Sequence, residues 1–126
     1  MRLLLDTVTF LFAIESPERL SRTAMSALQN PANLRELSTV SLAEIALKNA
    51  VGKLAITKDD VATAIEDLQL KILPYTVDHA LRLFELPLHH RDPFDRQIIA
   101  QALAENIPVV TCDPQFRHYK GLTVVW

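Results

Sequence analysis

Short apolar runs alternate along this chain with longer segments of helical periodicity. Leu3-Leu4-Leu5 forms the first run and predicts a strand that is buried on both faces. The intervening segments repeat apolar residues every three or four positions, as amphipathic helices do. We expect further strands near 37–40, 72–73, 109–111 and 122–125, and helices from about Thr9 to Pro17, over 20–28, 42–49, 61–68 and 79–86, and from Pro93 through Leu103. This alternation is typical of an α/β domain with a mostly parallel central sheet.

Composition limits the size and the chemistry of the protein. A chain of 126 residues with 49% apolar residues can bury one core, so we expect a single domain over residues 1–126. The two glycines, Gly52 and Gly121, leave no glycine-rich loop for a nucleotide phosphate. The one cysteine, Cys112, excludes an internal disulfide and a multi-cysteine zinc site. We interpret it as a packing residue and expect a reducing, cytoplasmic location.

Charge argues against a general polyanion binder and against a membrane protein. The formal net charge is -2, so a nucleic acid would have to be held by a local group of basic residues. The apolar stretch from Leu3 to Ile14 contains Asp6, and an acid there is not tolerated in a membrane span or a signal-peptide core. We therefore expect no membrane association.

Four acids stand at similar places relative to the expected strands and helices. Asp6 and Asp113 follow strands, and Glu44 and Asp95 lie in the first turns of helices. The carboxyl ends of parallel strands converge over one crevice, so we expect the four carboxylates to meet there. Like charges in a cleft raise one another's pKa unless a cation neutralises them. An all-oxygen ligand set favours Mg²⁺, with Mn²⁺ as a substitute.

Helix capping is the alternative explanation for three of these acids. Ser41 and Glu44 fit a capping box, Asp92-Pro93-Phe94-Asp95 fits a second, and Asp113-Pro114 fits a cap followed by proline. Asp6 shows no such pattern in the segment that follows it. For Asp92 a cap is favoured over a role as a fifth ligand. Capping does not require all the acids to lie at one edge of the sheet, so their joint placement favours a site.

Basic side chains near these acids are candidate contacts for a phosphodiester. They are Arg91, Arg96 and Arg117, with Lys120 and the histidines His89, His90 and His118 able to add hydrogen bonds. Scattered solubilising charge is the alternative for each of them. The aromatic residues sit in apolar contexts and are expected in the core: Phe10, Phe12, Phe84, Phe94 and Trp126.

Four motifs follow one another across the whole chain. They are Leu4-Leu5-Asp6-Thr7; Ser41-Leu42-Ala43-Glu44-Ile45-Ala46-Leu47-Lys48 with Gly52-Lys53-Leu54; Asp92-Pro93-Phe94-Asp95-Arg96 with Ile98-Ile99-Ala100; and Val110-Thr111-Cys112-Asp113. In this order and spacing the sequence resembles the PIN-domain ribonucleases, and among them the VapC-like toxins of bacterial type II toxin-antitoxin pairs. The resemblance implies a three-layer α/β/α PIN fold. It also implies Asp6, Glu44 and Asp95 as metal ligands, Asp113 as a fourth acid, and Thr7 and Ser41 as supporting hydroxyls.

The same resemblance implies an activity and partners. The activity is Mg²⁺-dependent endoribonuclease cleavage, in which a metal-activated water hydrolyses RNA phosphodiesters. The partners are a second copy of the chain and a cognate antitoxin that covers the active-site groove. Val8, Ala43 and Cys112 differ from the residues of many relatives. These differences leave one alternative open, a PIN-like module that binds a metal or a protein without cutting RNA.

Overall fold

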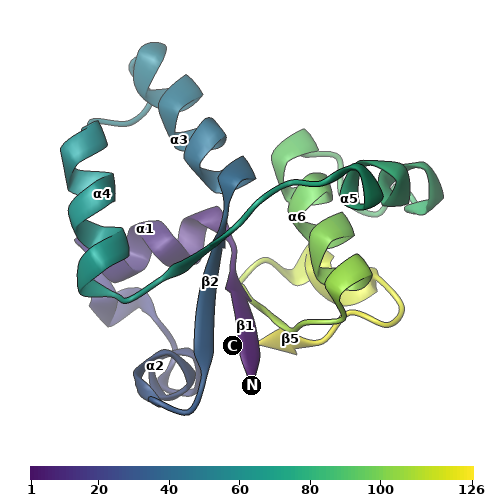
Figure 1. Cartoon of the computed structure of the whole chain (residues 1–126), viewed down its shortest axis with the longest axis horizontal. Helices are drawn as coiled ribbons and strands as arrows, with labels where there is room; N and C mark the ends of the chain where they lie inside the picture. Colours follow the sequence, from purple (N-terminus) through teal and green to yellow (C-terminus); the bar gives the residue numbers. More distant parts are fainter.

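Five strands form an all-parallel sheet in the computed structural model, which describes residues 1–126 (Figure 1). The strands are β1 (Arg2–Leu5), β2 (Leu34–Ser38), β3 (Lys71–Leu73), β4 (Val109–Val110) and β5 (Val124–Val125), in the spatial order β3-β2-β1-β4-β5. After β1 the chain extends the sheet on one side through β2 and β3, and later on the other side through β4 and β5. The connections therefore diverge at the carboxyl end of β1, which is where parallel sheets form their binding crevices.

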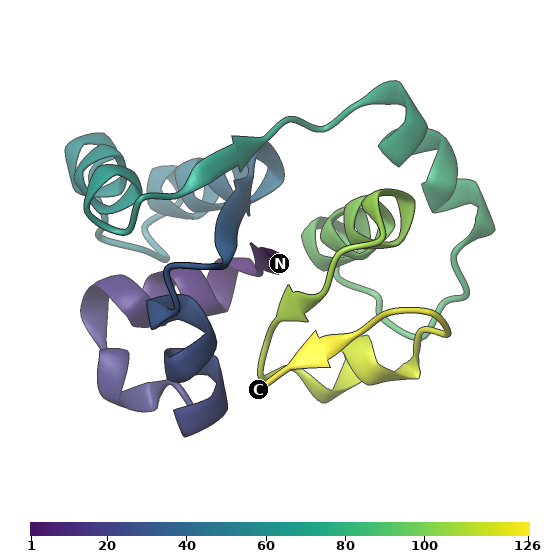
Figure 2. The same cartoon turned by 60° about the horizontal axis from the view of Figure 1, so that its bottom comes forward.

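Helices cover both faces of this sheet. They are α1 (Thr7–Glu15), α2 (Arg22–Gln29), α3 (Thr39–Ala50), α4 (Lys58–Asp67), α5 (Val77–Arg82) and α6 (Pro93–Glu105), with short 3₁₀ turns at Pro17–Arg19, Leu83–Glu85 and Pro114–His118. Figure 2 shows α5 and α6 on the opposite side of the strands from α1 and α2. The expected three-layer α/β/α arrangement is confirmed. None of the helices is long and apolar enough to span a lipid bilayer.

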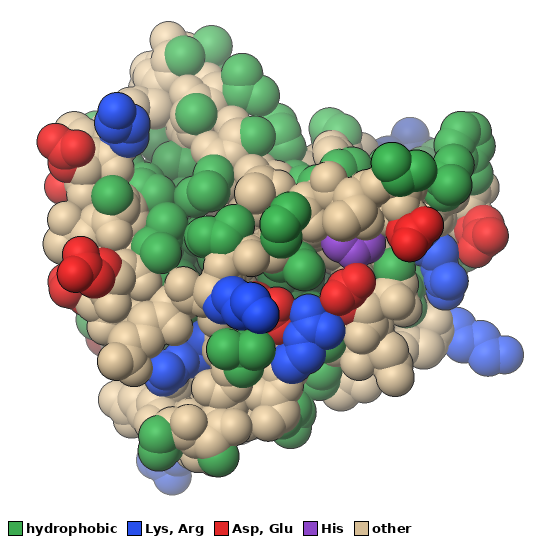
Figure 3. Space-filling view, in the orientation of Figure 1, with side chains coloured by type: hydrophobic (Ala, Val, Ile, Leu, Met, Phe, Trp, Pro, Cys, Tyr) green, Lys and Arg blue, Asp and Glu red, His purple; other side chains and the backbone are tan.

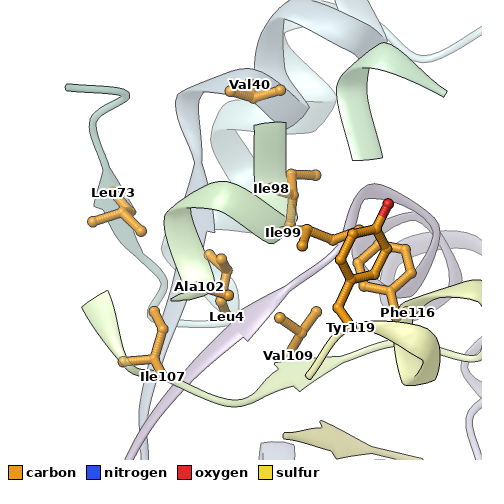
Figure 4. Packing of buried hydrophobic residues seen from close by; sticks show 10 residues of the cluster. All are labelled: Leu4, Val40, Leu73, Ile98, Ile99, Ala102, Ile107, Val109, Phe116 and Tyr119. Carbon is orange, nitrogen blue, oxygen red and sulfur yellow. The ribbon is translucent and has the colours of Figure 1, made fainter. Parts of the chain in front are cut away.

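The three leucines of β1 divide the core because successive side chains of a strand point to opposite faces. Leu4 packs with Ile98, Ile99 and other residues on the α6 side, and the ten members of this cluster are drawn in Figure 4. Leu5 packs on the other face with Phe10 of α1 and the apolar side of α4. Since β1 is buried on both faces, its carboxyl end and the acid that follows are held rigidly.

The start of α3 differs from the expected one. Ser38, the last residue of β2, caps the helix by accepting a hydrogen bond from the backbone N–H of Val40 at 2.9 Å. The Ser38 hydroxyl also donates to the buried Gln101 of α6. The predicted capping box of Ser41 and Glu44 is therefore wrong, and both residues lie one turn deeper in the helix. The expected strand near 37–40 is likewise shifted, because β2 ends where this cap begins.

Charges near the amino end of β1 are paired. The Arg2 guanidinium lies 2.6 Å from the carboxylate of the buried Glu36 and 3.1 Å from that of Glu105. His79, which is 1% exposed, places its Nε2 3.1 Å from the second Glu105 oxygen. The hydrogen bonds from His79 and Arg2 lower the pKa of Glu105. The acids of this region thus have protein partners.

One apolar face is left uncovered. Val77 and Leu81 of α5, Phe84 of the 3₁₀ turn and Leu88 beyond it are large apolar residues whose exposed fractions run from 56% for Leu81 to 89% for Phe84. We call these four residues the α5 strip. Phe84 therefore does not belong to the core, contrary to expectation, because α5 ends at Arg82 and the 3₁₀ turn that follows leaves this ring exposed. Figure 3 shows apolar side chains over α5 at the edge of the molecule.

The shared role of Ser38 gives a test of the helix start. We expect Ser38→Ala to lower the free energy of unfolding by about 1–3 kcal/mol, because α3 loses its cap and Gln101 loses a buried partner. Urea denaturation measures the change. Ser26→Ala, at an exposed position of α2, is the control and should stay within about 0.5 kcal/mol of the unsubstituted chain. Equal values for the two variants would contradict the assigned cap.

Candidate functional site

Asp6 directly follows β1 and is 2% exposed. Its Oδ1 caps α1 by accepting a hydrogen bond from the backbone N–H of Thr9 at 2.8 Å. The helix therefore begins at Thr7, and the expectation that this segment lacks a cap is wrong. The Asp6 Oδ2 accepts a hydrogen bond at 2.5 Å from the hydroxyl of Thr111, the residue that directly follows β4. Both oxygens of this carboxylate are thereby fixed in orientation.

Thr9 and Thr111 are site residues that the sequence reasoning did not single out. The Thr9 hydroxyl donates to the carbonyl of Val110 at 2.8 Å, and the Thr111 hydroxyl also accepts from the backbone N–H of Asp113 at 3.0 Å. These bonds join the start of α1 to the end of β4. A hydroxyl residue at the end of a strand, two positions before an acid, is the sequence signal by which Thr111 could have been found.

Glu44 lies in the second turn of α3 and is 4% exposed. Its Oε2 forms an ion pair with Lys48 Nζ at 2.5 Å. Its Oε1 is buried and has no hydrogen-bond donor. A buried carboxylate oxygen without a donor is costly unless something else satisfies it.

Asp92 and Asp95 open α6. Asp92 caps the helix, as expected, because its Oδ1 accepts from the backbone N–H groups of Phe94 and Asp95 at 2.8 and 3.2 Å. The reciprocal half of the expected capping box does not form, because the Asp92 backbone N–H donates to His90 Nδ1 at 3.1 Å. The Asp95 side chain, 20% exposed, is therefore available to the site.

Asp113 caps the last 3₁₀ turn, and its Oδ1 accepts from the backbone N–H of Gln115 at 2.9 Å. Its Oδ2 lies 2.7 Å from His90 Nε2, which is also 3.1 Å from Asp95 Oδ2. One ligand atom from each of His90, Asp95 and Asp113 thus lies within 4.8 Å of the others. His90 joins the site from a loop, where no periodicity of the sequence could place it.

The acids are close enough to perturb one another. Burial raises the pKa of Asp95 from 3.8 to about 8, and the charges of Asp92, Asp6, Glu44 and Asp113 add to the rise. Burial also raises the pKa of Asp6, against the lowering by its hydrogen bonds with Thr111 and Thr9. The carboxyl edge of the sheet therefore carries more negative charge than the protein neutralises, in contrast to the paired acids around Arg2.

Lys48 is the cation that the protein itself supplies to this edge. Its hydrogen bond to Glu44 raises its pKa, and the charges of Asp92 and Asp95 also contribute to that rise. One ammonium group does not balance the cluster. The unsatisfied Glu44 Oε1, the raised pKa of Asp95 and the neighbouring carboxylates together fit a divalent cation.

Thr7 and Ser41 lie next to the acids but bond to each other. The Thr7 hydroxyl donates to Ser41 Oγ at 2.9 Å, and both side chains are buried. This bond ties the start of α1 to α3. The Asp6 carboxylate is oriented by the Thr111 hydroxyl and the Thr9 backbone N–H rather than by Thr7 and Ser41.

The basic residues expected to contact substrate divide into two kinds. The Arg96 guanidinium donates to the carbonyl oxygens of Pro87 and His90 at 3.0 and 3.2 Å, so it braces the loop that carries His90. The substrate contact expected of Arg96 stays a prediction. Arg91 and Arg117 are exposed and follow His90 and Asp113 in the sequence by one and four positions. Cys112 is also exposed and so is not a packing residue, and desolvation followed by the Asp6 charge raises the pKa of its thiol.

Comparison with protein families identifies the class of this fold and site. The family model described as "PIN domain" matches residues 3–122. The chain therefore belongs to the PIN domain family, as the four motifs indicated. No curated protein sequence gives a significant match.

Solved structures share the fold across nearly the full chain. The crystal structure of VapBC2 from Rickettsia felis bound to a DNA fragment from their promoter contains a chain that is 20% identical, with a TM-score of 0.73 and coverage of 98% of this chain and 97% of that one. DNA-bound VapBC from Salmonella typhimurium gives 18% identity, a TM-score of 0.72 and coverage of 98% and 96%. VapBC-1 from nontypeable Haemophilus influenzae gives 21% identity, a TM-score of 0.68 and coverage of 98% of this chain and 96% of that one.

Asp95 gives the metal-free protein a characteristic pH dependence. Between its ordinary pKa of 3.8 and its folded value of about 8, the folded chain retains a proton that the unfolded chain has released. The stability that comes from this proton is fully present below the lower value and is lost as the pH rises through the upper one. We expect the melting temperature in EDTA to fall across this window for the unsubstituted chain, relative to Asp95→Asn.

The control for this measurement is Asp59→Asn, at an exposed position of α4. Its melting temperature should follow the unsubstituted chain at every pH. Adding Mg²⁺ above the upper pKa should restore stability to the unsubstituted chain and much less to Asp95→Asn. Parallel curves for the Asp95→Asn variant and the unsubstituted chain in EDTA would show that folding does not raise the pKa of Asp95.

Proposed function

We propose that this chain is a metal-dependent endoribonuclease that hydrolyses RNA phosphodiester bonds. The observation that carries the proposal is the group of acids at the carboxyl edge of the sheet, where burial and then the charges of Asp92, Asp6, Glu44 and Asp113 raise the pKa of Asp95 to about 8. Membership of the PIN domain family supports the same reading. The proposed unit is a single domain over residues 1–126.

Asp6, Glu44 and Asp95 are the proposed ligands, with Asp113 as a supporting ligand. Mg²⁺, or Mn²⁺ in its place, would lower the pKa of a bound water, orient a phosphate and stabilise charge on the leaving oxygen. Thr9 and Thr111 hold the Asp6 carboxylate in one orientation, and Glu44 offers its unpartnered Oε1. Lys48 holds the other Glu44 oxygen and can meet the phosphate with its ammonium group.

RNA in single-stranded or looped form is the proposed substrate. Its phosphates can approach an acidic edge only where basic side chains offset the repulsion, and the exposed Arg91 and Arg117 flank the loops that carry His90 and Asp113. Unpaired segments also bend more easily into a site at a sheet edge than a duplex does.

A toxin of a type II toxin-antitoxin pair, acting in the cytoplasm, is the proposed biological setting. Its support is the shared fold with chains from VapBC structures of Rickettsia felis and Salmonella typhimurium. An antitoxin is the proposed protein partner. A groove of about 440 Å³ between α3 and α4, lined by apolar residues that include Leu42, Ile45 and Val61, offers it a surface (Figure 3).

A second copy of the chain is the other proposed partner, paired through the α5 strip. Its four large side chains are exposed along α5 and the segment that follows it. An apolar surface of this kind on a folded chain is a common mark of association. The homodimer would bury the α5 strip and would not use the acids at the carboxyl edge of the sheet as contacts.

The activity is tested by adding Mg²⁺ to purified protein and labelled RNA. We expect cleavage, and we expect Asp6→Asn and Glu44→Gln to lose at least roughly a hundredfold in rate, because a metal site contributes several kcal/mol to such a reaction. Asp59→Asn is the matched control, since it removes an exposed acid of α4 and should leave the rate unchanged.

Two results would count against this mechanism. Cleavage that survives Asp6→Asn and Glu44→Gln would place the reaction elsewhere or assign it to a contaminant. Divalent ions that bind the folded chain without cleavage of any RNA would favour the alternative function, a PIN-like module that binds a metal or a protein without cutting.

The proposed dimer is tested by light scattering over a range of protein concentrations. We expect the unsubstituted chain to dimerise and Phe84→Glu to remain monomeric, because a charge in the centre of the α5 strip would be desolvated on pairing. Val51→Glu, which places the same charge at another exposed apolar position, is the control and should still dimerise. A monomeric unsubstituted chain, or a dimeric Phe84→Glu, would remove the α5 strip as the contact.

A further inference from the structure

His90, Asp95 and Asp113 together look like a mixed nitrogen and oxygen metal site. Their nearest ligand atoms lie within 4.8 Å of one another. A histidine ligand would change the chemistry of the site, because imidazole favours ions such as Zn²⁺ and Ni²⁺ over Mg²⁺. Whether His90 Nε2 carries a proton or a lone pair toward the acids therefore decides which ions this site prefers.

The hydrogen bonds of the His90 ring answer this question. Its Nδ1 lies 3.1 Å from the backbone nitrogen of Asp92, which can only donate. Nδ1 must therefore present its lone pair to that N–H group. In a neutral imidazole the other nitrogen then carries the proton, so Nε2–H points toward Asp113 Oδ2 at 2.7 Å.

The surroundings of His90 hold the ring in this orientation. The Phe116 ring, itself fully buried, meets it edge to face at a centroid distance of 5.6 Å. The His90 backbone N–H donates to the Tyr119 hydroxyl at 2.8 Å, and its carbonyl accepts from Arg96 at 3.2 Å. The side chain is only 11% exposed. A rotation that presented a lone pair to the acids would break the bond to Asp92 and disturb this packing.

We propose that His90 is a positioning residue that donates Nε2–H to Asp113 and stands beside Asp95, and that it is not a metal ligand. The donated bond fixes one Asp113 oxygen while the backbone of Gln115 fixes the other. The same ring nitrogen is 3.1 Å from Asp95 Oδ2, so it sets the spacing between the two carboxylates. The ligand set of the ion then consists of oxygen atoms alone. This inference rests on the proposed metal site.

Nitrogen-15 NMR of the histidine side chains tests the inference in the unsubstituted protein. The His90 signals are assigned by their loss in His90→Gln. We expect Nε2 protonated and Nδ1 unprotonated in EDTA, and the same pattern after addition of Mg²⁺ or Zn²⁺. A proton on Nδ1, on both nitrogens, or an Nε2 that loses its proton to Zn²⁺ would overturn the proposal.

Calorimetric titration with Mg²⁺, Mn²⁺ and Zn²⁺ adds a second measurement. We expect His90→Ala to weaken binding of all three ions by one common factor, roughly ten- to a hundredfold, as loss of an outer hydrogen bond to a ligand does. His90→Gln keeps a donor that can reach Asp113 and should recover most of the affinity. A loss confined to Zn²⁺, or no recovery with Gln in a folded variant, would show that His90 is itself a ligand.

The two proposals fail in different ways. An Nε2 that coordinates Zn²⁺ in a protein that still cleaves RNA would overturn only the role of His90. A chain that binds none of the three ions and cuts no RNA would overturn the proposed function, and with it the need for a positioning residue. The NMR pattern in EDTA reports on the His90 hydrogen bonds in either case.

Discussion

Repulsion among carboxylates at the end of β1 is the constraint on which the rest of this structure depends. The fold places Asp6, Glu44, Asp95 and Asp113 at one edge of the sheet and gives them one lysine as a counter-charge. Near the other end of β1, Arg2 contacts both Glu36 and Glu105. The acids at the amino end of β1 thus have basic partners, whereas most of the acids at the carboxyl edge have none. Loss of stability at a functional site, offset by packing elsewhere, is a common pattern in enzymes.

Acids of the candidate site also cap helices and turns. Asp6 and Asp113 each use one oxygen to cap a helix or turn, and direct the other toward Thr111 or His90. Asp92 caps α6 and at the same time raises the pKa of Asp95. A cap anchors a carboxylate to the backbone, so it supplies the rigidity that a site needs. Capping and site formation, which compete as explanations of a sequence pattern, are compatible in the folded chain.

Much of the fold could be predicted from the sequence, because strong local patterns produced it. Leu3-Leu4-Leu5 predicted the central strand β1, and Asp92-Pro93 predicted the start of α6. The start of α3 was misjudged because Ser38 and Ser41 are both good caps, and only the contact of Ser38 with Gln101 decides between them. Thr111 was missed as a site residue and His90 was expected only as a substrate contact, because their bonds to Asp6 and Asp113 join positions 105 and 23 residues apart.

The two edges of the sheet limit how another polypeptide can be recognised. β3 has three residues and β5 has two, so an added strand would find few backbone groups with which to bond. Binding by strand addition draws its affinity from a run of such main-chain bonds. A protein that recognises this domain must therefore bind the side chains of its helices. Its specificity will depend on the shape of apolar surfaces rather than on main-chain hydrogen bonds between strands.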